Sequence, residues 1–334
     1  MKRVVFFKIL AVVLMMTTGC SDITVIETNS MMTTSYNDMT VITMTTKTDE
    51  VIIIDVAGYG TLTIDWGDGS VETRTLEVYN KDDWDDYKYE YRHEYSCTSL
   101  RTITITGKIT HLACCNNELT SLDVSKNTAL TYLACSSNEL KSLDVSKNSV
   151  LTDLSCFGNQ LTSLDVRKNT ALTNLSCSNN QLTSLDVRNN TALTNLSCSS
   201  NQLTSLDVSK NTVLIKLDCS DNQLTSLDVR KNIKLTHLAC FFNQLKSLNV
   251  CNNIGLINLG CGFNQLTSLN VSNNTVLTRL SYGENELTSS ALNALFEMLH
   301  RNEGEKDIYI CKTTETDNSD WRIAEAKGWT VYIH

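Results

Sequence analysis

Eight cysteines follow one another at intervals of 21 residues. Thiols at fixed spacing can bind zinc, form disulfides or carry redox chemistry. In stacked coils, however, such cysteines stand about 4.8 Å apart, beyond the usual ~3.5–4.5 Å between the Cβ atoms of a disulfide. A straight column also cannot surround a tetrahedral zinc ion, so we expect buried packing residues. The column consists of Cys114, Cys135, Cys156, Cys177, Cys198, Cys219, Cys240 and Cys261.

Carboxylates form a second column, in which six aspartates are followed in register by two asparagines. Repulsion between neighbours can be offset by basic residues two or three positions later, such as Lys126 and Arg167. Calcium needs about six to eight converging oxygens, which a flat ladder does not supply. A solvated ladder is therefore favoured over a cation site. The column runs through Asp123, Asp144, Asp165, Asp186, Asp207, Asp228, Asn249 and Asn270.

Large side chains at outward positions are the third candidate, because exposed aromatics often anchor a ligand. Most outward positions of the repeats hold Ser, Asn or Thr. The alternative for Phe241 is that its ring covers Gly262 and protects the backbone. A further acidic and aromatic segment, Lys81–Tyr87, can contact a sugar or a cation, although a solvated loop is the simpler interpretation. The candidate ligand-binding residues are Tyr132, Phe157, His237, Phe241, Phe242 and Phe263.

Catalytic motifs are missing from the sequence. It contains no HExxH, Walker or GxSxG segment, and its five histidines have no nucleophile or carboxylate at motif spacing. We therefore predict that the protein is not an enzyme and that it uses no cofactor and no catalytic or structural metal.

The elements that position these columns are short strands and turns. Each repeat reads LxxLxCxxNxLxxLDVxxNxx and contains the same half-phrase twice, as in Leu172–Asn180 and Leu182–Asn190. Each half predicts a short strand with inward residues two apart, such as Leu175 and Cys177. The asparagine after each strand can bond its side chain to neighbouring backbone. Only stacking buries the apolar side of such a coil.

The phrase LDVSKNTALTYLAC at 122–135 and its copies resemble the leucine-rich-repeat family. They are most similar to the cysteine-ladder repeats of internalin J-type surface proteins. The resemblance implies a mainly β fold, namely a right-handed solenoid of about nine 21-residue coils with a parallel sheet on one face. It also implies an adhesin or a protein-recognition scaffold, although function is inherited less strictly than fold.

Residues 41–107 predict β-structure, with strands at 41–46, 50–57, 61–66, 71–78, 89–95 and 101–106. The segment Ile64–Ser70 (IDWGDGS), with His93–Tyr95 and Ile103–Ile105 later on, resembles PKD-like domains. That resemblance implies an immunoglobulin-like β-sandwich that acts as a spacer or an adhesive module.

Residues 289–334 predict a small α/β cap over the open end of the solenoid. Ser289 or Ser290 can cap a helix, and strands are expected at 307–311 and 329–333. A second helix is expected at 319–327, ended by Gly328. The apolar face of the first helix consists of Leu292, Leu295, Phe296 and Leu299.

The N-terminus predicts a signal peptide at 1–19, with basic residues before an apolar run. Thr17–Cys20 resembles a bacterial lipobox, with Thr17 where Leu is usual, which implies lipidation of Cys20. The alternative is an ordinary secretory signal with an incidental cysteine. Residues 20–40 then form a lipidated tether, followed by the PKD-like domain (41–107), the solenoid (108–288) and the cap (289–334).

A formal net charge of −9 disfavours nucleic acid as a partner. Membrane contact is expected only through the lipid anchor. We therefore predict a lipid-anchored protein of the bacterial cell envelope, at the outer membrane or cell surface, although Asp22 leaves retention at the inner membrane open. Its expected role is non-catalytic, adhesin-like binding of a protein or glycan. The alternative is a structural or accessory envelope lipoprotein without a host ligand.

Overall fold

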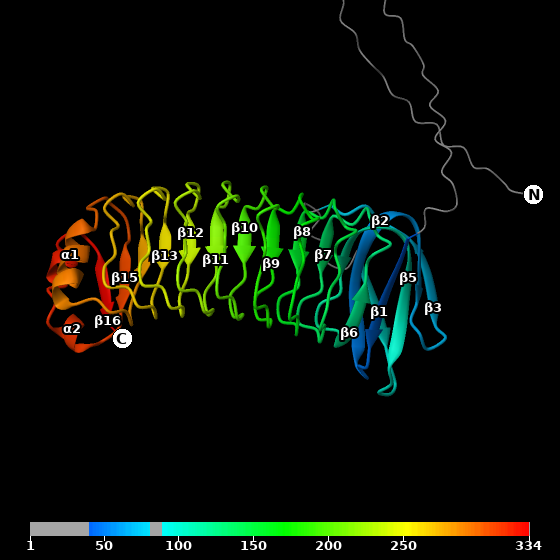
Figure 1. Cartoon of the computed structure of the whole chain (residues 1–334). Coiled ribbons are helices and arrows are strands. Elements are labelled where there is room, and N and C mark those ends of the chain that lie inside the picture. Colours follow the sequence, from blue (N-terminus) through cyan, green and yellow to red (C-terminus); the bar gives the residue numbers. More distant parts are fainter. Residues whose placement is uncertain (1–39, 81–88, 334) are drawn as a thin grey trace, which may run out of the picture. The chain divides into compact units, whose positions relative to one another are not determined.

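The computed structural model describes residues 40–80 and 89–333. The expected signal peptide, Cys20 with the tether up to residue 39, and the acidic loop at 81–87 lie outside the described residues. Residues 40–333 belong to one compact unit, and its mainly β solenoid architecture is as the repeats predict (Figure 1). Within these residues, no helix is both long enough and apolar enough to cross a membrane.

One three-residue strand per coil contributes to a parallel sheet, and equivalent residues 21 apart pair directly, as Leu175 does with Leu196. The nine predicted coils are present, because the end of a longer strand, β5 (Arg101–Ala113), pairs with the first of eight such strands. These eight are β7 (Tyr132–Ala134), β8 (Asp153–Ser155), β9 (Asn174–Ser176), β10 (Asn195–Ser197), β11 (Lys216–Asp218), β12 (His237–Ala239), β13 (Asn258–Gly260) and β14 (Arg279–Ser281).

The second half of each repeat, which also predicts a strand, forms one only in the first coil, as β6 (Leu119–Asp123). There it pairs with β1 (Thr40–Thr46). In the later coils this half is not a strand. Its backbone contacts the neighbouring coil at its start, where the N–H of Gln181 donates to the carbonyl of Leu161 at 2.9 Å. The expected second strand therefore needed a partner that only the first coil has.

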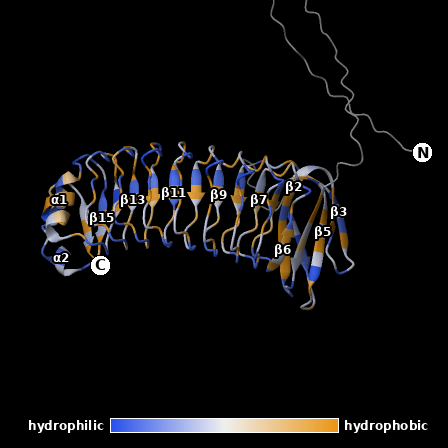
Figure 2. Cartoon of the chain, viewed as in Figure 1, coloured by the Kyte–Doolittle hydropathy of each residue, from blue (hydrophilic) through white to orange (hydrophobic). Residues whose placement is uncertain are grey.

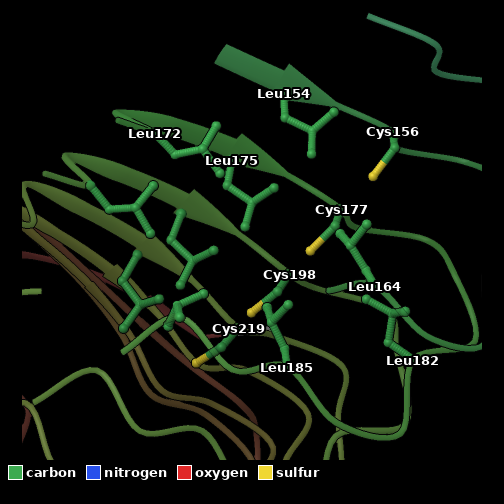
Figure 3. Close-up of a cluster of buried hydrophobic side chains, with 14 of the residues drawn as sticks. Leu154, Cys156, Leu164, Leu172, Leu175, Cys177, Leu182, Leu185, Cys198 and Cys219 are labelled. Atoms are coloured by element: carbon green, nitrogen blue, oxygen red, sulfur yellow. The ribbon is translucent and has the colours of Figure 1, made fainter. Parts of the chain in front are cut away.

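Leucine, cysteine and valine side chains fill the interior of the stack. Leu154 and Leu175 point inward from neighbouring strands, and Cys156 and Cys177 point inward directly after those strands (Figure 3). Hydrophobic and hydrophilic residues alternate within each coil, and the pattern recurs along the stack (Figure 2). Because each coil completes the core of its neighbours, no coil can bury its apolar side alone.

The residues before the solenoid pair around β2 (Val51–Asp65), β3 (Val71–Thr75) and β4 (Glu90–Glu94). β2 pairs antiparallel with β3, β4 and β5. The sequence predicts two strands at 50–57 and 61–66, whereas the structure has one. Gly58 permits this continuity, since a Cβ there would lie 2.0 Å from the carbonyl oxygen of Lys108.

Strand β5 links this region to the solenoid. It pairs with β1 and β2 along most of its length and with β7 at its end. The boundary expected between residues 107 and 108 therefore falls inside a strand that serves both parts. The sequence places the end of this strand at 106, whereas the structure extends it to Ala113.

The N-terminal strands take the place of a coil before the first one. The side chain of Asn117 donates to the carbonyl of Ile53 at 2.7 Å and accepts from the N–H of Ile53 at 3.0 Å. The hydroxyl of Thr46 donates to the carbonyl of Asn117 at 2.8 Å. Through these contacts, a non-repeating segment supplies hydrogen-bond partners to the polar groups at the open end of the first coil.

At the other end, β15 (Asp307–Ile310) and β16 (Thr330–Ile333) continue the parallel sheet beyond β14. Helix α1 (Ser289–Met298) is present, but its cap is Thr288 rather than Ser289 or Ser290, because the Thr288 hydroxyl accepts from the N–H of Ala291. The second expected helix is shorter than predicted, α3 (Arg322–Glu325), and a further short helix, α2 (Thr314–Asp317), was not predicted. A Thr313 capping box defines the start of α2.

Candidate functional site

The cysteine column lies in the core. All eight side chains are 0% exposed, and all eight thiols are free rather than in disulfides. Burial raises the pKa of every one of these thiols, to about 12 for Cys156 and Cys261. A protonated and enclosed thiol is a poor nucleophile and a poor metal ligand. The packing interpretation of the column is confirmed.

The first asparagine column bonds each coil to the one before it. Asn180 donates to the carbonyls of Cys156 and Cys177, at 3.0 and 3.1 Å, and accepts from the N–H of Leu161 at 3.0 Å. Each of these carbonyls accepts from two asparagines, one of its own coil and one of the next coil, since Cys156 accepts from Asn159 at 3.1 Å as well as from Asn180. The column therefore uses both acceptor sites of these cysteine carbonyls. Its members are Asn117, Asn138, Asn159, Asn180, Asn201, Asn222, Asn243, Asn264 and Asn285.

The second asparagine column lies at the other turn and is more deeply buried, with Asn190 0% exposed against 9% for Asn180. Asn190 donates to the carbonyls of Val166 and Asn169, at 2.9 and 2.8 Å. Its Oδ1 is buried and has no hydrogen-bond partner. Both columns are thus used by the backbone of the fold and are not available to a ligand.

The aspartate column is solvated and bonded to its own turns. Each carboxylate accepts from the backbone N–H two positions later, as Asp186 does from Arg188 at 3.1 Å. The Arg188 guanidinium also donates twice to this carboxylate, at 2.9 and 2.8 Å. These bonds lower the pKa of Asp186 to about 2, with the arginine side chain as the largest cause. The ladder interpretation is confirmed. Within the described residues, no group of three or more His, Cys, Asp or Glu side chains could hold a metal ion.

A groove of about 670 Å³ runs along the outer face of the parallel sheet, from Tyr132 to Ser281. Its volume lies within the ~300–1,000 Å³ typical of ligand sites. Small residues such as Ser176, Ser197 and Ala239 lie along it, because outward positions alternate with the buried leucines of the strands. A row of longer polar side chains follows the groove, namely Asp153, Asn174, Asn195, Lys216, His237, Asn258 and Arg279.

Part of the polar row is bonded from coil to coil. Asn174 donates to Asp153 at 2.5 Å, and Asn195 donates to Asn174 at 2.5 Å. The charges along the row are unequal, with a carboxylate at Asp153 and a guanidinium at Arg279 near the two ends. The two ends of the groove therefore differ in charge, which would not be the case if all the repeats were identical.

Three of the six candidate residues line this groove and three do not. Tyr132, His237 and Phe241 are among its lining residues. Burial, with a smaller effect of Lys216, lowers the pKa of His237, which favours its neutral form. The other three are exposed and lie outside the groove lining: Phe157, Phe242 and Phe263.

Tyr132 ends a stack of three rings at the start of the groove. It stacks on His111 with centroids 4.0 Å apart, and His111 stacks on Tyr79 at 4.0 Å. Burial lowers the pKa of His111 to about 4, so this ring is neutral at physiological pH. Sequence reasoning missed Tyr79, which lies outside the repeats, and also Asp153, Lys216 and Arg279. Asp153, Lys216 and Arg279 occupy the same repeat position as Tyr132 and His237. The repeat alignment could therefore have predicted that they face outward.

Phe241 lies over a notch in the backbone. A Cβ at Gly260 would lie 2.1 Å from its ring, and one at Gly262 would lie 3.5 Å from it. The covering role considered for Phe241 is therefore real, but the ring rests mainly on Gly260 and not on Gly262. The same ring also lines the groove.

Phe242 and Phe263 form a stacked pair on the adjoining turns. Their ring centroids are 4.2 Å apart with an angle of 16° between the planes. Their side chains are 52% and 42% exposed, so the stack buries only part of either ring. The expected proximity of the two residues is thus present, on a ridge beside the groove.

Known proteins of similar structure share this solenoid, although no protein-family model matches the chain and no curated protein matches its sequence. Among solved structures, it is similar to the functional domain of InlJ from Listeria monocytogenes, which includes a cysteine ladder. The two share 35% identity and a TM-score of 0.50, over 66% of this chain and 52% of that one. This chain thus spans about half the length of that domain.

Two further structures are similar at lower scores. An internalin (inlF) from Listeria monocytogenes has 19% identity and a TM-score of 0.43, over 67% of this chain and 82% of its own. YopM, a leucine-rich effector protein from Yersinia pestis, has 25% identity and a TM-score of 0.45, over 60% and 56%. In its fold, the described chain is a leucine-rich-repeat solenoid with a cysteine ladder.

Proposed function

We propose that the protein is a non-catalytic, adhesin-like binding module of the bacterial cell surface that recognises a protein or glycan through the groove on its parallel sheet. The groove itself is the observation that carries this proposal. It extends over eight coils, and polar side chains of different charge follow it. Neighbouring coils hold the backbone of these residues in register, and the side chains of Asp153, Asn174 and Asn195 are bonded to one another, which lowers the entropy lost on binding.

The anchoring part of the proposal rests on the N-terminal sequence. A signal peptide at 1–19, a lipid on Cys20 and a tether to residue 40 would attach the solenoid to the outer membrane or cell surface. The strands at 41–107, with their PKD-like sequence, would then act as a spacer joined to the solenoid (108–288) through β5, with a cap at 289–334. A protein partner agrees with the likeness in fold to leucine-rich-repeat proteins.

A blocking substitution tests the groove. Ser176→Trp places a large ring in the groove lining, and a large ring is tolerated in this column because Tyr309 pairs in register with Ser281. Ser184→Trp is the matched control, since Ser184 is exposed in the second half of the same coil. Circular dichroism would establish that both variants are folded.

The parent and the two variants would be screened against immobilised mucins, glycans and matrix proteins. We expect a saturable ligand whose affinity falls at least about tenfold with Ser176→Trp and stays unchanged with Ser184→Trp. Equal binding by both variants would place the site elsewhere. The absence of any saturable ligand, together with copurification with envelope proteins, would favour the accessory envelope role.

A further inference from the structure

Four residues at equivalent places in successive turns form a ridge beside the groove: Asp221, Phe242, Phe263 and Glu284. We call them the turn ridge. Their order is shown by backbone bonds of 3.1 Å between neighbouring coils, from Asn222 N–H to Phe242 and from Asn243 N–H to Phe263. A third bond of 3.1 Å runs from Asn264 N–H to the carbonyl of Glu284. The ridge thus presents a carboxylate, two rings and a second carboxylate in line.

All four residues have left-handed backbone conformations, with φ between 51° and 54°. The same place in earlier coils holds Asn116, Ser137, Gly158, Asn179 and Ser200, most of which tolerate this region well. Phenylalanine has no local hydrogen bond that would favour a positive φ, so it is costly at such a place. Both rings are about half exposed, so their burial offsets only part of this conformational cost. Another gain must offset the rest.

The rings of the turn ridge lean toward one another. Their centroids are 4.2 Å apart, less than the coil spacing of about 4.8 Å. The outer face of the Phe242 ring therefore lies on the side of the Asp221 turn, and that of the Phe263 ring on the side of the Glu284 turn, where the Glu284 carboxylate also interacts with the thiol of Cys311. Phe241 differs from this pair because its ring fills the notch at Gly260.

A cation is attracted both to the face of an aromatic ring and to a carboxylate. Each end of the turn ridge offers this combination once. The two ends are separated by two coil spacings, or about 10 Å. The net charge of −9 would also attract a basic partner to this protein from a distance.

We infer that the turn ridge docks a basic protein segment through two Lys or Arg side chains about 10 Å apart, one on each outer ring face. The inference deepens the proposed function and rests on it, since it names the class of partner that would contact the ridge while the groove holds the rest of the ligand. The left-handed phenylalanines are then explained by binding and not by folding.

A peptide of matching spacing is the probe. Two arginines three residues apart in a proline-rich peptide lie about 9 Å apart on one side of a polyproline II helix. The control peptide carries neutral citrulline at both places. Binding to the full chain would be followed by NMR of ¹³C-labelled phenylalanine, which is selective because the sequence has seven phenylalanines.

The test variant is Phe242→Asn with Phe263→Asn, because asparagine tolerates the left-handed region. The control variant is Ile233→Asn with Ile254→Asn, which removes another pair of residues one coil apart, 59% and 63% exposed, at the other turn. We expect resonances of Phe242 and Phe263 to shift with the arginine peptide and roughly tenfold weaker binding of the citrulline peptide. The phenylalanine variant should lose this difference without a lower melting temperature, and the isoleucine variant should keep it.

Equal binding of the two peptides, or unchanged binding by the phenylalanine variant, would overturn the inference. So would a phenylalanine variant that melts at a clearly lower temperature, because the rings would then serve the fold. The proposal for the groove is tested independently of the proposal for the turn ridge. A groove ligand that is lost with Ser176→Trp but is bound normally by the phenylalanine variant leaves the proposed function intact and refutes only the ridge.

Discussion

Replacing Asn180 by alanine should destabilise the solenoid more than replacing Asn190, although both are buried asparagines of one coil. Asn180→Ala removes the bonds that the two Nδ2 hydrogens donate to Cys156 and Cys177, with a longer shared contact to Ser178 at 3.2 Å, and leaves the N–H of Leu161 without its acceptor. Asn190→Ala also removes two donated bonds. It leaves no donor unsatisfied, however, and it eliminates an Oδ1 that has no partner.

The magnitudes follow from these counts. A net contribution of about 1 kcal/mol per hydrogen bond gives about 2 kcal/mol for the two donated bonds in either variant. The cysteine carbonyls keep a second donor, since Asn159 still donates to Cys156, so they add little. The buried N–H of Leu161 adds about 1–3 kcal/mol in the first variant only. We therefore expect losses of about 4 kcal/mol for Asn180→Ala and about 2 kcal/mol for Asn190→Ala.

Urea unfolding followed by circular dichroism measures both losses, with Gln181→Ala as the control. Gln181 is exposed in the same coil, so its substitution should change the free energy of unfolding by less than about 0.5 kcal/mol. If Asn180→Ala and Asn190→Ala cost the same, the unsatisfied N–H is not the decisive effect. If Asn180→Ala matches Gln181→Ala, the ladder itself contributes nothing.

Gly260→Ala should cost about 1–3 kcal/mol in urea unfolding, because the new Cβ would lie 2.1 Å from the Phe241 ring. Most of the loss should disappear in a Phe241→Ala background. An equal loss in both backgrounds would show that the Phe241 ring is not what excludes a side chain at residue 260. For Asp186, whose pKa of about 2 lies below an ordinary value of about 3.9, the bonds to Arg188 favour the folded state above pH ~4 and this effect fades toward pH 2. In Arg188→Gln a carboxyl titration by NMR should give a pKa closer to the ordinary value, and an unchanged pKa would assign the shift to the backbone bond alone.

The repeating part of the fold was predictable because each coil pairs with a copy of itself. A strand residue such as Leu175 meets Leu196 in the next coil, so one local pattern determines all the pairings of the sheet. The first coil has no copy before it. Its partners, Ile53 and Thr46, come from 64 and 71 residues earlier, and no periodicity signals such distant contacts. This is why the end of β5 was underestimated while the first strand of each repeat was placed well.

The candidate site was predictable in part for the same reason. Outward columns follow from the register, so the repeat alone indicates that Tyr132 and His237 face outward. The ring of Tyr79 carries no such signal, because its stack with His111 joins a non-repeating loop to the first coil. The left-handed turns at Phe242 and Phe263 did have a signal in the sequence. Asn, Ser, Gly or Asp occupies the same column in six other coils, from Asn116 to Asp221, and these are the residues that favour such turns.

The asparagine bonds that join successive coils have a consequence for how such a protein changes over generations. Since the asparagine of every interior coil donates to the coil before it, as Asn180 does to Cys156 and Asn201 does to Cys177, removal or duplication of one 21-residue unit would join surfaces that already match. The special contacts at Asn117 and at β15 are needed once each, however many units lie between them. Recombination between near-identical repeats can therefore lengthen or shorten the groove by single coils, and so alter the reach of the protein without a new folding problem.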